Sequence, residues 1–211
     1  MQLKELCRFC DDYLNVPDFK DYCPNGLQVE STAEVARLVT GVTASMALIE
    51  AAIEDGADTL LVHHGYFWKG EGAPLVGNKG RRIAALIRNN INLIAYHLPL
   101  DVHSCVGNNV HLGKLMGWTV DGGFVEVGGK PLVLSGRPDE ELTLHQLTAL
   151  IGKKLGNTPL AISAGSHAIT RIAWCTGAAQ NYLEAAVDEG VDVFVSGEIS
   201  ENTVHFARES G

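Results

Sequence analysis

The feature that most constrains the fold of this chain is a segment that occurs twice. EAAIEDGADTLLVHHG at residues 50–65 aligns without gaps with EAAVDEGVDVFVSGEI at residues 184–199. An apolar strand-like stretch and a small-residue turn precede each repeat, GVTAS in one case and CTGAA in the other. The repeat predicts an internal duplication, with two βαβ halves facing each other across a pseudo-twofold axis. The alternative is that two separate βαβ units share a glycine and some alanines without common origin.

The stretches around the first repeat alternate between strand and helix patterns. RLVTGVTAS (37–45) is rich in β-branched residues, MALIEAAIEDG (46–56) has apolar residues at helical spacing, and TLLV (59–62) is a short apolar strand. RRIAALIRNN (81–90) predicts a further helix, and INLIAYHLPLD (91–101) predicts a further strand. This order predicts an α/β fold with a mixed, mainly parallel sheet and helices on both faces.

The residue composition and the pattern of apolar residues change twice along the chain. Residues 1–116 form the expected first α/β half. Residues 117–165 begin with the glycine-rich GWTVDGGFVEVGGKPLVLSG and predict an inserted α+β subdomain. Residues 166–211 form the expected second half, which contains no counterpart of the strand at 91–101. We therefore expect this half to be one strand short.

Charge and cysteine usage restrict the partners and the compartment. The formal net charge is −9, so a nucleic-acid backbone would be repelled over most of the surface unless a local basic stripe exists, and nucleic acid is an unexpected though not excluded partner. Asp11 and Asp12 interrupt the opening segment where a signal peptide needs an apolar core, and no run reaches transmembrane length, so we expect a cytoplasmic protein without membrane contact. Five cysteines suit reduced thiols. Cys7 and Cys10 lie in an amphipathic helical pattern and are interpreted as packing or surface residues rather than a zinc or redox pair.

Two adjacent histidines follow the apolar strand TLLV. His63 and His64 stand at its carboxyl end, where open α/β sheets place their ligand sites. The next strand also ends in a polar cluster, which contains His97, Asp101 and His103. Imidazole and carboxylate together suit Zn, Mn or Fe. The alternative is that the two histidines are strand-end residues whose hydrogen bonds are satisfied by the backbone.

The adjacency of His63 and His64 favours two metal ions rather than one. Neighbouring residues of an extended strand point to opposite faces, so we expect the two side chains not to chelate a single ion easily. Each could hold one of two divalent ions a few ångströms apart, an arrangement that activates water for attack on a polarised substrate. The sequence therefore predicts a dinuclear metal site.

Several of these motifs together resemble a known family. VTGVTAS, LLVHHGYFWKG, YHLPLD-x-H, GNN and GEISENTVHFARESG resemble the NGG1-interacting-factor-like family, whose bacterial members are commonly named GTP cyclohydrolase 1 type 2 homologs. The resemblance implies a duplicated α/β fold, a toroidal homohexamer built as a trimer of dimers, and a two-metal site facing the ring interior. The metal ligands that it implies at matching positions are His63, His64 and Asp101.

The resemblance also implies ligands for which this sequence has no matching positions. The family uses a Gly-His-His-x-x-x-Glu motif beyond the GEISE segment, and this motif is absent here. His205 is not a substitute, because it lies on the helix that precedes the motif. We therefore expect this chain to hold metal incompletely.

Other polar and aromatic residues allow two interpretations each. His97 is expected to act as a catalytic proton shuttle or to be a structural imidazole bonded to the backbone. Glu198, which aligns with His64 in the repeat, could line the pocket. Tyr66, Phe67 and Trp68 could form an aromatic wall for a planar ligand, although packing is the more common role. Cys175 is expected to be an inert core residue.

The leading functional hypothesis is a dinuclear metal-dependent hydrolase. It would act on an unidentified small molecule with a cyclic amide, amidine or phosphoester group, and the family's cyclohydrolase name points to a purine-like ring. The sequence contains no glycine-rich phosphate loop and no arginine cluster that would bind a triphosphate. The alternative is a non-catalytic ring, a metal-carrying or regulatory scaffold that binds protein or nucleic acid.

Overall fold

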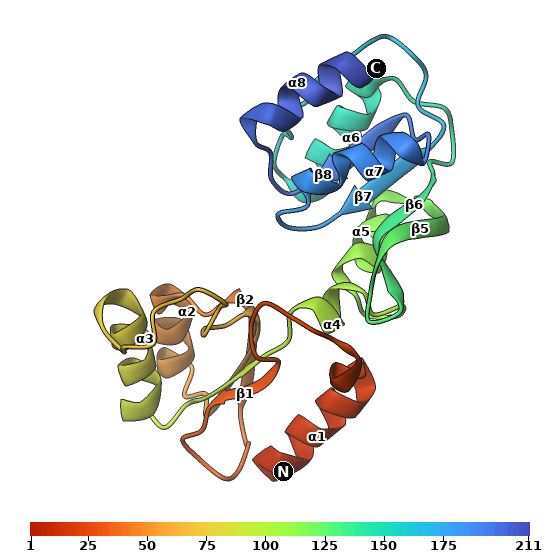
Figure 1. Cartoon of the computed structure of the whole chain (residues 1–211). Helices are drawn as coiled ribbons and strands as arrows, with labels where there is room; N and C mark the ends of the chain where they lie inside the picture. Colours follow the sequence, from red (N-terminus) through yellow and green to blue (C-terminus); the bar gives the residue numbers. More distant parts are fainter. The chain divides into compact units, whose positions relative to one another are not determined.

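The computed structural model describes residues 1–211, which form two compact units, Met1–Leu100 and Asp101–Gly211. Each unit contains one mixed four-stranded sheet with helices packed against it, which confirms the predicted α/β class (Figure 1). The strands thus form two sheets rather than the single expected one. No helix of the chain has the length and apolar character needed to cross a membrane.

The first unit is built on a sheet with the strand order β1-β4-β3-β2. β2 pairs parallel with β3 and β3 pairs parallel with β4, whereas β1 pairs antiparallel with β4. Its elements are α1 (Leu3–Leu14), a 3-10 turn η1 (Val16–Asp18), β1 (Gly26–Val29), β2 (Leu38–Thr43), α2 (Met46–Glu54), β3 (Thr59–His64), α3 (Gly77–Arg88) and β4 (Asn92–Ala95). The short helix α4 (Leu98–Asp101) follows β4.

Alternating side chains of the first sheet pack on opposite faces. Leu93 and Ala95 of β4 join the core beneath α2 and α3, whereas Ile94 and the following Tyr96 pack against α1. Figure 1 shows α2 and α3 on one side of this sheet and α1 on the other. Such two-sided coverage explains why the strands read as continuous apolar runs instead of alternating patterns.

The second unit has the strand order β5-β6-β7-β8. β5 and β6 form an antiparallel hairpin, β6 pairs antiparallel with β7, and β7 pairs parallel with β8. Its elements are α5 (Asn108–Met116), β5 (Thr119–Val127), β6 (Lys130–Arg137), α6 (Leu144–Leu155), β7 (Ile172–Cys175), a 3-10 turn η2 (Gln180–Tyr182), α7 (Leu183–Asp188), β8 (Val193–Ser196) and α8 (Glu201–Ser210). Its core contains Trp174 of β7 together with apolar residues of α5, β6 and α6.

The division into units differs from the expected division at residues 117 and 166. The hairpin β5–β6 belongs to the same sheet as β7 and β8, so residues 117–165 share a core with residues 166–211. Backbone hydrogen bonds between β6 and β7 join the two segments. The strand expected over residues 91–101 is also shorter, because Leu98–Asp101 turns into helix with Pro99 in its first turn, where proline is tolerated.

The pairing of the strands reproduces the sequence repeat. In β2 and β3, Leu38 lies opposite Thr59; at the equivalent positions of β7 and β8, Ile172 lies opposite Val193. A glycine ends the connecting helix in both cases and adopts a left-handed conformation, with φ of 69° at Gly56 and 66° at Gly190. Only glycine takes this conformation without steric cost. The two βαβ units therefore share register as well as sequence.

An aspartate bridges the two strands of each repeat in the same way. Asp58 Oδ2 accepts hydrogen bonds from Ala36 N at 2.8 Å and Arg37 N at 2.9 Å. Asp192 Oδ2 accepts from Thr170 N at 2.7 Å and from Arg171 N at 2.8 Å. Burial works against the charged form, but these hydrogen bonds outweigh it and lower the pKa of both carboxyls. The aspartate common to both repeats is therefore explained by the fold.

Candidate metal centre

The histidine pair lies at the carboxyl end of β3, as predicted. β3 continues through His63 and His64 before it ends, and it lies between β2 and β4 in the first sheet. His97 follows β4, the neighbouring parallel strand, and so reaches the same edge. The ring centroids of His63 and His97 are 5.0 Å apart, and those of His64 and His97 are 5.7 Å apart. Three imidazoles thus meet at the edge where parallel sheets carry their sites.

The two adjacent histidines are not separated by the sheet. Their ring centroids are 4.4 Å apart, and the three histidines each offer a ligand nitrogen within 4.8 Å of the others. The expectation that alternation along the strand keeps His63 and His64 apart is therefore wrong. Alternation holds within a sheet, but β3 ends at His64, and side chains at a strand end can converge above the edge. The cluster fits the imidazole ligand chemistry of Zn, Mn or Fe.

Each of the first two histidines is oriented through its Nδ1 atom. His63 Nδ1 lies 2.9 Å from Tyr96 O. Because a carbonyl only accepts, Nδ1 of His63 carries the hydrogen and the ring lone pair is on Nε2. His64 Nδ1 lies 3.2 Å from Thr43 Oγ1, the hydroxyl of the residue opposite it in the β2–β3 ladder. Metal-binding histidines are commonly held in this way, with one nitrogen bonded to the protein and the other directed to the ion.

The third histidine is held by a buried carboxylate that the sequence analysis missed. His97 Nδ1 lies 2.8 Å from Asp21 Oδ1, and the Asp21 side chain is only 2% exposed. Asn25 supports the same residue, since its Oδ1 accepts from His97 N at 2.7 Å. Asp21 and Asn25 belong to the segment DYCPNG (21–26), whose Pro-Asn-Gly sequence is typical of a turn. Its aspartate and its Pro-Asn-Gly signal give no indication of the distant histidine.

The remaining predicted site residues lie in the second unit. Asp101 is buried, and its Oδ1 accepts a hydrogen bond from Asn108 Nδ2 at 2.8 Å. His103 is also buried, and its Nδ1 accepts from Cys105 N and Val106 N, both at 3.2 Å. Glu198 is exposed just beyond β8. The histidine cluster is thus complete within the first unit, whereas Asp101 and Glu198 belong to the second.

The three aromatic residues after the histidines have different roles. Tyr66 is buried and donates from its hydroxyl to Ala44 O at 2.7 Å, so it is a packing residue. Phe67 is exposed, with the Lys79 ammonium 5.8 Å from its ring centroid. Trp68 lies against the cluster, with its ring centroid 4.9 Å from that of His97 and 5.9 Å from that of His64. Of the three, only Trp68 borders the candidate site.

The cysteines show none of the features of a second reactive centre. All five are free. Cys7 and Cys10 lie on α1, where burial raises the pKa of both thiols. Cys175 lies in the core strand β7, and burial raises the pKa of its thiol to about 12. A thiol with such a pKa stays protonated and unreactive at neutral pH, as expected for Cys175.

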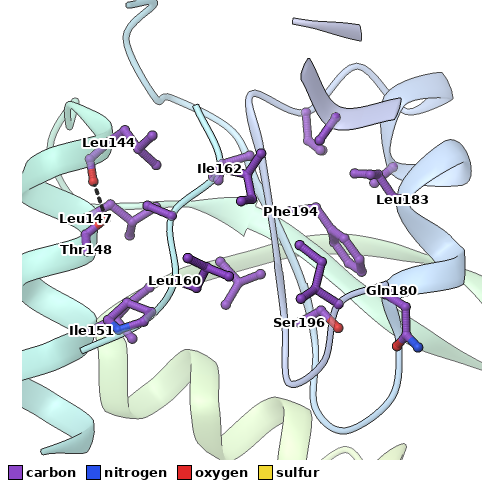
Figure 2. Close-up of a pocket in the computed structure, with 18 of the residues that line it drawn as sticks. Leu144, Leu147, Thr148, Ile151, Leu160, Ile162, Gln180, Leu183, Phe194 and Ser196 are labelled. Carbon is purple, nitrogen blue, oxygen red and sulfur yellow. Dashed lines mark hydrogen bonds between the residues drawn. The ribbon is translucent and has the colours of Figure 1, made fainter. Parts of the chain in front are cut away.

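A large cavity lies in the second unit. Its volume is about 1040 Å³, and it runs along β8 between α6 and α7 (Figure 2). Its lining is mainly apolar, with Leu147, Ile151, Leu160 and Phe194 among the residues shown in Figure 2. β8 pairs only with β7, whereas the equivalent β3 has a strand on both sides. The cavity therefore lies beside the open edge of the second sheet.

The comparisons with known proteins agree on one family. The family model described as Duf34/NIF3 (NGG1p interacting factor 3) matches residues 1–211. A GTP cyclohydrolase 1 type 2 homolog of Pseudomonas aeruginosa is 49% identical over 209 residues, covering 99% of this chain and 82% of the relative. One of Vibrio cholerae is 55% identical over 192 residues, covering 90% and 76%. A solved structure described as protein ybgI, of unknown function, has a TM-score of 0.95 at 44% identity and covers 100% of this chain and 84% of its own.

Proposed function

This chain belongs to the Duf34/NIF3 (NGG1p interacting factor 3) family, and on that premise we propose that it is a divalent-metal-dependent hydrolase. The proposed ligands are His63, His64 and Asp101, and His97, whose ring lies beside those of His63 and His64, is proposed as the group that holds or moves a proton. The observation that carries the proposal is the convergence of three imidazoles at one sheet edge, two of them with Nδ1 facing an obligate acceptor.

The donor set fits a borderline divalent ion. Neutral imidazole suits Zn, Mn and Fe, and a carboxylate such as Asp101 adds the negative charge that two neighbouring ions require. When bound, such ions act as Lewis acids that polarise a substrate and lower the pKa of water. We propose a site for two ions, as the family resemblance implies, which the residues of this sequence coordinate incompletely because the Gly-His-His-x-x-x-Glu motif has no match here.

The residues around the cluster determine what the site can do with a substrate. His97 has Nδ1 fixed by Asp21, so its Nε2 can take a proton from water and return it to a leaving group. Trp68 offers an aromatic surface within contact distance of two of the imidazoles. An indole beside a proton-transfer group suits a flat ring with a hydrolysable carbon–nitrogen bond. This chemistry agrees with the cyclohydrolase name of the relatives, and we propose a purine-like ring or another cyclic amide as the substrate class.

Two further properties belong to the same proposal. We propose that the chain assembles into a closed homo-oligomer, a hexamer in the family pattern. We also propose that it works in the cytoplasm, where its five free cysteines would remain reduced. Neither property is required for metal binding by the histidine cluster.

Metal content and turnover test the proposal together. The protein would be stripped with a chelator, reloaded separately with Zn²⁺, Mn²⁺ and Fe²⁺, dialysed and subjected to elemental analysis. It would then be assayed against cyclic amides and purine nucleosides and nucleotides. We expect bound metal and metal-dependent hydrolysis, both reduced at least tenfold in His63→Ala and His64→Ala. The control is His145→Ala, which removes an exposed histidine of α6.

Two results would contradict the proposal in different ways. Retention of the same metal content in His63→Ala and His64→Ala would show that the cluster is not the metal centre. Metal binding that depends on these histidines, with no hydrolysis of any substrate tested, would instead favour the metal-carrying scaffold.

A further inference from the structure

The turn at residues 21–25 holds His97 from two directions. Asp21 bonds the imidazole through Oδ1, at 2.8 Å from Nδ1, and the backbone through Oδ2, which accepts from Leu98 N at 2.9 Å. Asn25 completes the clamp by accepting from His97 N at 2.7 Å and by donating to Asp21 Oδ2 at 2.9 Å. Ring and backbone of His97 are thus fixed by one short segment that is far away in sequence.

We propose that Asp21 is a positioning residue that fixes His97 as the Nδ1–H tautomer and so places the imidazole lone pair on Nε2. An ionised carboxylate has no hydrogen to donate and can only accept, so the hydrogen between the two groups belongs to His97 Nδ1. Burial pushes the pKa of Asp21 upward, but hydrogen bonds from His97, Asn25 and Leu98 outweigh it and hold the pKa below its usual value. Asp21 therefore stays ionised at neutral pH.

The same neighbourhood could be interpreted as a separate metal site, and the hydrogen bonds argue against it. Asp21, Cys23 and His97 each offer a ligand atom within 4.8 Å of the others. However, the Asp21 oxygens already accept four N–H groups, from Tyr22 N, Asn25 Nδ2, Leu98 N and His97 Nδ1. A carboxylate has about four lone-pair sites in total, so these donors occupy them. Cys23 is also buried, and desolvation together with the charge of Asp21 raises the pKa of its thiol to about 12.

The consequence of this tautomer lies on the other side of the ring. Because Nδ1 is bonded to Asp21, Nε2 is the nitrogen that His97 can bring to His63 and His64. A lone pair there can bind an ion or accept a proton, whereas an Nε2–H group can do neither. The same lone pair makes His97 a further ligand of the cluster in this proposal, and loss of the carboxylate that supports a ligating imidazole typically weakens metal binding about 10- to 100-fold. This second consequence rests on the proposed metal centre, but the tautomer itself does not.

Asp21→Asn is the substitution that should reverse the tautomer. An amide has one oxygen for the two positions that the carboxylate oxygens occupy. The oxygen is expected at the Oδ2 position, because the donors there include the backbone N–H of Leu98, which cannot turn away. The amide NH₂ then faces His97 Nδ1 and displaces only the Tyr22 N–H, which belongs to an exposed residue and can bond water. His97 must then accept at Nδ1 and carry its hydrogen on Nε2.

The experiment reads the tautomer directly. Two-bond ¹H–¹⁵N correlation spectra of ¹⁵N-histidine-labelled, metal-free protein would be recorded at a pH well above the ordinary imidazole pKa of about 6.5. We expect Nδ1–H for His97 in the wild-type protein, Nε2–H in Asp21→Asn, and no change in Asp18→Asn. The last variant removes the same charge from an exposed residue of the turn η1. Zinc affinity would then be measured for Asp21→Asn alone and in a His97→Ala background.

The proposal requires the zinc affinity to fall about 10- to 100-fold in the first case and to stay unchanged in the second, because Asp21 acts through His97. A wild-type His97 that carries its hydrogen on Nε2 would overturn it, and this measurement needs no variant to fold. So would an unchanged tautomer in Asp21→Asn, or an equal loss of zinc affinity in the His97→Ala background. If the wild-type protein binds no zinc, the proposed function fails, while the tautomer comparison still decides the role of Asp21.

Discussion

Gly65 follows the histidine pair directly, and the structure explains why a side chain should not be tolerated there. A Cβ atom at this position would lie 2.8 Å from the Cβ atom of Ala95 and 2.7 Å from Gln28 Cδ, and still closer to Gln28 Oε1. Gln28 could swing its amide away, but Ala95 is fixed in the buried strand β4. The change Gly65→Ala must therefore displace both a hydrogen-bonded side chain and a strand.

The expected loss of stability has two parts. Overpacking of a filled site costs about 1–3 kcal/mol. Movement of Gln28 would also break the hydrogen bond that its Oε1 accepts from Tyr66 N at 2.7 Å, which contributes about 1 kcal/mol. We expect the free energy of unfolding of the first unit to fall by about 2–4 kcal/mol, a large part of the 5–15 kcal/mol typical of a domain. Displacement of the backbone at residue 65 should also weaken metal binding by the adjacent His64.

Urea unfolding followed by hydrogen-exchange mass spectrometry would measure this loss, because its peptides report the two units separately. The matched control is Gly72→Ala in the same loop, where an added Cβ would meet only Pro74 Cδ at 3.9 Å. Its stability should change by less than about 0.5 kcal/mol, as for most surface substitutions. If the two variants unfold at the same urea concentration, the close approach at Gly65 does not constrain the site and the reasoning is wrong.

Three further predictions concern charge, thiols and assembly. The folded-state pKa values of Asp58 and Asp192 are lowered, so the stabilisation that these carboxylates contribute is complete above the unfolded-state pKa of about 4 and is lost as the pH falls through the folded-state values. Asp58→Asn and Asp192→Asn should therefore each make the free energy of unfolding, measured by urea titration, depend less on pH in the acid range. An unchanged pH profile would contradict this. Exposed Cys105 should react with a disulfide reagent at least tenfold faster than buried Cys175, whose thiol has a pKa of about 12, and equal labelling rates in native protein would refute the assignment. Light scattering should give a closed oligomer, with a hexamer expected; a monomer at micromolar concentration would end the proposed assembly.

The parts of the structure that the sequence predicts are those carried by short-range patterns. The repeat at residues 50–65 and 184–199 predicts the matching βαβ registers, because helix and strand periodicities are local. The strand-end position of His63 and His64 predicts where a site lies, because parallel strands meet with their carboxyl ends at one edge. Both predictions need only the order of elements along the chain.

The parts that the sequence does not predict depend on contacts between distant segments. Asp21 lies 76 residues from His97, and no local pattern links an aspartate in a turn to an imidazole after a strand. The sequence of the hairpin β5–β6 is rich in glycine, which suggests a separate subdomain. Backbone hydrogen bonds between β6 and β7 nevertheless make the hairpin part of the same sheet as β7. The prediction that the side chains of His63 and His64 lie on opposite faces is wrong for a related reason, since alternation describes strand interiors and both residues stand at a strand end.

Comparison of the two repeats separates the residues that serve the fold from those that serve the site. Asp58 and Asp192 make the same pair of backbone hydrogen bonds, so this carboxylate supports a strand crossover wherever the unit occurs. His63 and His64 align instead with Gly197 and Glu198, although the strands β3 and β8 that lead to these positions have equal register. A role in packing would favour similar residues in both repeats, because the paired strands have the same register up to Val62 in one repeat and Ser196 in the other. The histidines occur only in the repeat whose strand lies next to β4 and therefore next to His97 and its Asp21 clamp. The two histidines are thus found where neighbouring side chains could share a ligand with them, and they are absent from the repeat that has the same fold without those neighbours. This is the pattern expected of a binding centre.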